Sequence, residues 1–159
     1  ILSRPAGNYR AGGRAVHAER DFRRRSVVLS RMSPMGRPAM MVQGIYEVAI
    51  PVRQLERAET FYRDVLGLEV GLRDDRRRWL FLRAGGPAGM ILLQEQAGEF
   101  PSHHFAFTAT GSELQEAVTV LRGFGVATRG PVFHGWMPGT SLYFEDPDGH
   151  ELELFAPST

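Results

Sequence analysis

The pattern of apolar and polar positions changes several times after residue 44, and each change predicts an element. The run IYEVAIPV (residues 45–52) has the apolar, partly β-branched character of a strand. The following segment, LERAETFYRDVLG, places its apolar residues at helical spacing, and Gly67 supplies a stop at its end. Three further strands are expected, near residues 68–72, 78–82 and 90–94. The predicted order is β, α, β, β, β.

The second half of the chain repeats this order. HHFAFTAT reads as a strand, and SELQEAVTVLRGFG reads as a helix that Ser112 is placed to cap. Three strands are expected after it, near residues 126–129, 141–144 and 151–155. The sequence therefore predicts an α+β domain at residues 41–159, with two tandem βαβββ modules at about residues 44–96 and 102–157.

Alignment of the two modules places chemically active residues at equivalent positions. Glu47 falls over His104, and Leu92 falls over Glu153. Because side chains alternate along a strand, Glu47, His104 and Glu153 are predicted on the same side of their strands, two of them on central strands. A buried polar residue there is costly unless it is paired, hydrogen-bonded or bound to a metal. One His and two carboxylates form a plausible ligand set for Mn, Fe, Co, Ni or Zn.

Each of these three residues also has an ordinary structural explanation when it is taken alone. Glu47 fits a hydrogen-bonded carboxylate, His104 fits a satisfied core histidine, and Glu153 fits a solvated strand residue. The repeat is what favours the metal site, because coincidence would have to match strand, helix, glycine and strand in one order.

The composition of the chain limits the kinds of metal site and binding partner that can be expected. The chain has no Cys, so thiolate metal sites are excluded, and no apolar run approaches the roughly 20 residues of a membrane helix. Residues 1–40 hold nine Arg against Glu19 and Asp21, whereas residues 41–159 hold ten Arg against sixteen acidic residues. The predicted domain is therefore acidic, which argues against nucleic-acid binding by it. We expect a cytoplasmic protein of bacterial origin with a small-molecule substrate.

Residues 1–40 are rich in Arg, Gly, Pro and Ser and show no sustained apolar period. They are predicted to form a disordered tail. Three explanations stay open: the tail lies upstream of the true start at Met35, Met40 or Met41, it is a targeting segment, or it is a binding arm.

Three segments carry a resemblance to a known family: IYEVAIPVRQLERAETFYRDVLGLEV, HHFAF and SLYFEDPDGHELELF. They resemble the vicinal oxygen chelate superfamily, which includes glyoxalase I, extradiol dioxygenases, methylmalonyl-CoA epimerase, fosfomycin-modifying enzymes and bleomycin-resistance proteins. The resemblance implies a curved, cleft-bearing mixed β-sheet with flanking helices. It also implies that the metal ligands are Glu47, His104 and Glu153.

Two positions depart from the family pattern. The first ligand is usually His, so Glu47 is a candidate both for a metal ligand and for a catalytic base. The fourth ligand of glyoxalase I would fall at Leu92, which cannot bind a metal, and this counts against lactoylglutathione lyase activity. The last segment is similar to fosfomycin thiol transferases, with Ser141 and Tyr143 at their serine and tyrosine, but Phe133 stands where those enzymes have lysine.

Further candidates surround these ligands. Tyr143 is a candidate catalytic residue, and Ser141, Trp136 and His134 are candidates for substrate binding. The loop at residues 133–139 is a candidate lid, although packing over the open sheet would equally explain its aromatic residues.

The sequence supports three functions. The first is a divalent-metal-dependent enzyme of lyase, isomerase or dioxygenase type that chelates two oxygens of a small substrate. The second is a metal-free ligand-binding protein of the bleomycin-resistance type, and a fosfomycin-type thiol transferase is a minor alternative. The third is an interaction or regulatory module that keeps only the fold.

A homodimer is expected, since open sheets expose unpaired edges. The family resemblance implies that Glu47 of one subunit can meet His104 and Glu153 of the other, and a site within one chain stays open as the alternative.

Removal of residues 1–40 is expected to leave thermal stability nearly unchanged, because this segment has no apolar face to contribute to a core. The melting temperatures of the full chain and of a variant that starts at Met41, measured by circular dichroism, test this. A fall of many degrees, or an insoluble product, would show that the tail is structural.

Overall fold

A computed structural model describes residues 44–86 and 89–158, and the predicted tail at residues 1–40 lies outside these residues. The first module contains β1 (Glu47–Val52), α1 (Leu55–Thr60), the π-helix η1 (Phe61–Val65), β2 (Glu69–Asp74), β3 (Trp79–Arg83) and β4 (Met90–Glu95). The second contains β5 (His104–Thr108), α2 (Gly111–Gly123), β6 (Thr128–His134), β7 (Gly139–Glu145) and β8 (Glu151–Pro157). No helix in the described part of the chain is long and apolar enough to span a membrane.

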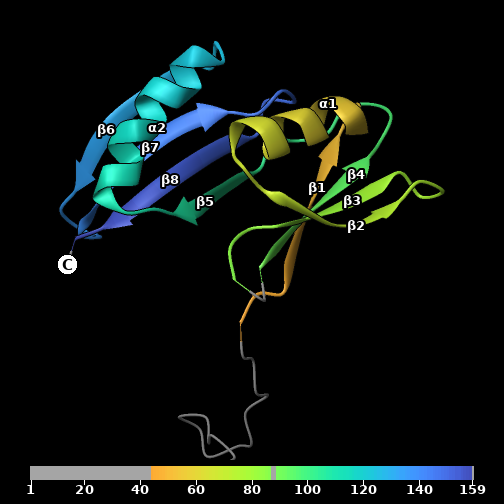
Figure 1. Ribbon diagram of the computed structural model, residues 1–159, viewed down its shortest axis with the longest axis horizontal. Coiled ribbons are helices and arrows are strands. Elements are labelled where there is room, and N and C mark those ends of the chain that lie inside the picture. The colour runs from red at the N-terminus through yellow and green to blue at the C-terminus, as the bar shows by residue number, and fades with distance from the viewer. Residues whose placement is uncertain (1–43, 87–88, 159) are drawn as a thin grey trace, which may run out of the picture. The chain divides into compact units, whose positions relative to one another are not determined.

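Each module forms its own four-stranded mixed sheet, in the order β1-β4-β3-β2 and β5-β8-β7-β6 (Figure 1). The first and last strands of each module pair in parallel, and the remaining pairs are antiparallel. This confirms the α+β class and the two βαβββ modules. The predicted stop glycines, Gly67 and Gly125, have φ angles of 72° and 75°, which glycine adopts without steric cost.

The strand order corrects one expectation about the site. Glu47 on β1 and His104 on β5 were predicted on central strands, yet both strands lie at the edges of their sheets. Only Glu153, on β8, lies on a central strand. Sequence periodicity fixes the face of a side chain but not the lateral order of strands, which depends on pairing between distant segments.

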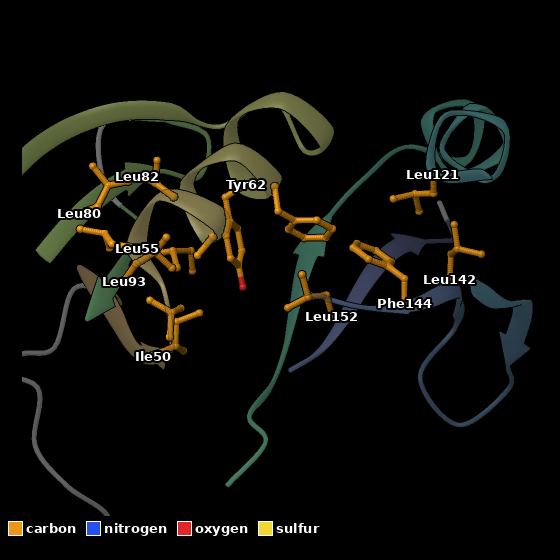
Figure 2. Packing of buried hydrophobic residues seen from close by; sticks show 14 of the residues in the cluster. Ile50, Leu55, Tyr62, Leu80, Leu82, Leu93, Leu121, Leu142, Phe144 and Leu152 are labelled. Carbon is orange, nitrogen blue, oxygen red and sulfur yellow. The ribbon is translucent and has the colours of Figure 1, made fainter. Parts of the chain in front are cut away.

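The helices cover one face of each sheet, and the side chains directed to that face form one apolar core. In β1 the core residues are Ile50 and Val52, and in β8 Leu152 belongs to the core; all three are fully buried. The cluster draws on both modules, and Figure 2 shows Tyr62 in this view between side chains of the first module and Leu152 and Phe144 of the second. The opposite face of the second sheet carries the polar residues described in the next section.

A charged residue from β4 caps α1. The N-cap residue Gln54 makes no side-chain capping bond, and the backbone N–H of Leu55 donates instead to Oε2 of Glu95 at 2.8 Å. Arg78 donates to both Glu95 and Glu56, so one guanidinium joins the helix to the sheet. Arg78 and the Leu55 N–H lower the pKa of Glu95, which keeps the cap ionised.

The cap of α2 differs from the prediction. Thr110, not Ser112, is the N-cap residue, and its hydroxyl accepts from the backbone N–H of Glu113. The Glu113 carboxylate accepts in return from the Thr110 N–H at 2.7 Å, which completes a capping box. Ser and Thr are both favourable N-cap residues. Thr110 is the cap because Glu113 follows it by three residues, which is the spacing of a capping box.

A buried carboxylate joins the two modules. Oδ2 of Asp146, in the turn before β8, accepts from the Tyr62 hydroxyl of η1 at 2.8 Å. Its Oδ1 accepts from the backbone N–H groups of Asp148 and His150, and the His150 ring lies 2.7 Å from the carbonyl oxygen of Pro51. Burial, followed by the charge of Asp146, raises the pKa of Tyr62 far above its usual value, so the hydroxyl stays protonated and donates.

The substitution Tyr62→Phe is expected to lower the free energy of unfolding by about 1.5–3 kcal/mol, because it removes a hydrogen bond to a buried carboxylate. Urea unfolding followed by circular dichroism measures the change. Tyr46→Phe is the matched control, since Tyr46 is 65% exposed and should lose almost nothing. Equal stability of the two variants would contradict the role of this contact.

Candidate metal centre

The face of the second sheet opposite the helices gathers most of the predicted site residues. Strand register places Ala106, Glu153, Tyr143 and Arg129 in one row across β5, β8, β7 and β6. His104 lies directly beside Glu151 in the next row. Alternation along the strands therefore directs the His104, Glu151, Glu153 and Tyr143 side chains to the same face, as the sequence predicted for His104 and Glu153.

Glu153 is a carboxylate held in a fixed position. It is 6% exposed, and the hydroxyl of Ser141, which is fully buried on the neighbouring strand β7, donates to its Oε1. A buried carboxylate is costly unless it has such a hydrogen-bond partner. Ser141 was predicted to bind substrate, which stays a prediction, and in the structure its hydroxyl donates to Glu153.

His104 lies between two carboxylates. Its Nε2 is 3.2 Å from Oε2 of Glu153, and its Nδ1 is 3.1 Å from Oε1 of Glu151. About half of the His104 side chain is exposed. Ser141 occupies one oxygen of Glu153, so the other oxygen and Nε2 of His104 form a pair of donors on the open face.

Tyr143 and His134 also lie together on this sheet. The Tyr143 hydroxyl is 3.0 Å from Nε2 of His134, and the guanidinium of Arg129 lies 4.3 Å from the centre of the Tyr143 ring. Trp136 lies 6.0 Å from His134 between ring centres and is 80% exposed. His134 belongs to β6 rather than to a loop, so the predicted lid at residues 133–139 is shortened to the turn between β6 and β7.

Glu47 is not brought to the other two predicted ligands within one chain. It is exposed at the start of β1 in the first sheet, and its neighbour across the strand pair is Met90. Among the residues that the structure describes, no three His, Cys, Asp or Glu side chains are placed to hold a metal ion together. The expected convergence of Glu47, His104 and Glu153 is therefore absent from the single chain.

The donors that are present fit a divalent cation as a partial site. Zn, Mn, Fe, Co and Ni accept both ligand types, an imidazole nitrogen and a carboxylate oxygen. The two atoms lie 3.2 Å apart on one face of the sheet, and a hydroxyl binds the second oxygen of the same carboxylate. Two ligands alone hold such an ion weakly, so a complete site needs a further donor.

Sequence reasoning missed Glu151 and Arg129. Nη2 of Arg129 donates to Oε2 of Glu151 at 2.9 Å, and Glu151 contacts His104 through its other oxygen. The alternating sequence ELELF could have indicated Glu151, because side chains two residues apart, such as Glu151 and Glu153, lie on the same face of a strand.

An apolar cavity of about 820 Å³ lies between the modules. Val48 and Leu66 from the first module and Phe105, Phe107 and Val120 from the second contribute to its lining. Of these, Val48, Leu66, Phe105 and Phe107 are partly buried and pack against the core. A cavity of this size and polarity is typical of small-molecule sites.

Comparison with known proteins identifies the family. Residues 44–154 match the model of the Glyoxalase/Bleomycin resistance protein/Dioxygenase superfamily. The metallothiol transferase FosB of Staphylococcus saprophyticus is 27% identical over 121 residues, which cover 72% of this chain and 77% of the relative.

Two solved structures support the same assignment. An integron cassette protein from the mobile metagenome of the Halifax Harbour sewage outfall is 44% identical, covers 72% of this chain and 99% of its own, and has a TM-score of 0.69. Lactoylglutathione lyase from Agrobacterium tumefaciens is 28% identical, covers 72% of this chain and 94% of its own, and has a TM-score of 0.61. The chain therefore belongs to the Glyoxalase/Bleomycin resistance protein/Dioxygenase superfamily.

Proposed function

We propose that this protein is a divalent-metal-dependent enzyme that acts on a small, oxygen-rich substrate. The observation that carries the proposal is the donor pair formed by His104 Nε2 and Glu153 Oε2 on the open face of the second sheet. The Glu153 carboxylate is 6% exposed and is oriented by a buried hydroxyl, so its second oxygen is held beside the imidazole in a defined direction. The metal-dependent activity named for the FosB relative agrees with this.

The bound cation would supply Lewis acidity to two substrate oxygens, and the reaction is of lyase, isomerase or dioxygenase type. The chain's own residues perform four tasks. Glu153 and His104 hold the cation, and Ser141 fixes the direction of the Glu153 carboxylate. Tyr143, whose hydroxyl is held by His134, orients a substrate oxygen. Glu47 serves either as the third ligand or as the base that moves a proton.

We further propose that a second copy of the chain completes the site. Glu47 lies on the edge strand β1, and His104 lies on the edge strand β5, so both stand where another chain can approach. In a homodimer with shared sites, Glu47 of one subunit would face His104 and Glu153 of the other. The absence of a three-ligand group from the described part of one chain agrees with this arrangement.

A second candidate function rests on the apolar cavity between the modules. A metal-free protein of the bleomycin-resistance type would bind its ligand by apolar contact, and the lining of Val48, Phe105 and Phe107 suits that role. Metal content separates the two functions, because only the enzyme requires a cation.

The purified protein is expected to bind about one Zn²⁺ or Mn²⁺ per chain, and His104→Ala or Glu153→Ala should remove this binding, because each deletes a proposed ligand. Isothermal titration of metal-free protein and elemental analysis measure it. Glu145→Ala is the control, since it removes an exposed carboxylate from the same sheet. Full metal content in both ligand variants would refute the ligand assignment.

Mixing Glu47→Ala protein with His104→Ala protein under conditions of subunit exchange is expected to restore metal binding to one of the two sites in each heterodimer. That site takes its intact Glu47 from one subunit and its intact His104 from the other. Each variant alone provides the baseline. A protein that is monomeric by sedimentation at micromolar concentration and still binds the metal would rule out the shared site.

A further inference from the structure

The two ring nitrogens of His104 face two different carboxylates. A neutral imidazole carries one N–H, and here each ring nitrogen faces a carboxylate at nearly the same distance, 3.1 Å to Glu151 and 3.2 Å to Glu153. A nitrogen that binds a cation must present its lone pair, so the proton has to lie on the other nitrogen. The two carboxylates thus favour opposite forms of the ring.

Strand register explains why both carboxylates reach one ring. His104 and Glu151 are direct partners in the parallel pair of β5 and β8, and Glu153 lies two residues further along the same face of β8. The imidazole extends from its own row to the next, so its Nδ1 remains beside Glu151 while its Nε2 approaches Glu153. Substitution at position 151 therefore alters one side of the ring only.

Glu151 is itself oriented. Its Oε2 accepts from Nη2 of Arg129 at 2.9 Å, which leaves Oε1 directed at Nδ1 of His104. Arg129 in turn lies over the ring of Tyr143, 4.3 Å from its centre. The contacts from Tyr143 through Arg129 to Glu151 thus hold the carboxylate in the orientation that faces the histidine.

We propose that Glu151 is a positioning residue that accepts a hydrogen bond from Nδ1 of His104 and thereby leaves the lone pair of Nε2 directed at Glu153 and the open face. The consequence for a bound cation rests on the proposed function, whereas the effect on the proton does not. Without Glu151, the acceptor that remains is Glu153, which draws the proton to Nε2 and blocks the nitrogen that would hold the cation.

The position of the proton is the first test. Long-range ¹H–¹⁵N spectra of metal-free protein distinguish the two tautomers of a neutral imidazole. We expect Glu151→Ala to reduce the fraction of His104 that carries its proton on Nδ1, and Glu151→Gln to preserve more of it, because the amide oxygen can still accept. Glu145→Ala is the matched control, since Glu145 lies directly across from Glu151 on β7 and contributes the same charge to the same face.

An unchanged tautomer ratio in Glu151→Ala, or an equal change in Glu145→Ala, would overturn the proposal. The substitution is suitable because about 44% of the Glu151 side chain is exposed, so its loss should not disturb folding. Retained far-ultraviolet circular dichroism checks this directly.

Metal affinity is the second readout, with Co²⁺ as the probe because its visible spectrum reports ligation. Glu151→Ala is expected to weaken Co²⁺ binding by about 10-fold to 100-fold, as loss of an outer carboxylate does at other histidine ligands. Unchanged affinity would overturn the role of Glu151 toward the cation. A wild-type protein that binds no Co²⁺ would refute the proposed function, and the tautomer ratio would still decide the role of Glu151.

Discussion

The parallel pairing of the first and last strands in each module is the constraint on which the site depends. Antiparallel neighbours follow from short connections, whereas β1–β4 and β5–β8 join segments separated by a helix and two further strands. In the second module this pairing sets His104 beside Glu151 and within reach of Glu153. The helix face supplies the apolar burial that stabilises each sheet, and in the second module the other face carries the polar groups.

The two modules share a backbone pattern and differ in chemistry. Leu92 lies opposite Ala49 as Glu153 lies opposite Ala106, so the alignment of the halves is reproduced by the strand register. In the second module the equivalent row carries a carboxylate held by a hydroxyl, and in the first it carries a buried leucine. The first module thus offers Glu47 alone, and the second offers a donor pair with its supporting residues.

Contacts between the modules hold them in a definite relation within the described domain. Both oxygens of Asp146 accept hydrogen bonds, one from the Tyr62 hydroxyl and one from two backbone N–H groups. Loss of any of these bonds to a buried carboxylate would lower the free energy of unfolding. With the modules joined in this way, Glu47 remains apart from His104. The proposed dimer is the arrangement in which a second chain would bring its Glu47 to these residues.

The sequence by itself determined the order of helices and strands, the two-module repeat and the face on which His104 and Glu153 lie, because hydrophobic periodicity and the repeat are local properties of the chain. It also favoured a metal site, a hypothesis that rests on residue types. Only the tertiary structure decided that Glu47 stays apart from His104, that Ser141 orients Glu153 and that Glu151 faces Nδ1. These features depend on which strands become neighbours and in which register, and that is settled by packing between residues far apart in the sequence.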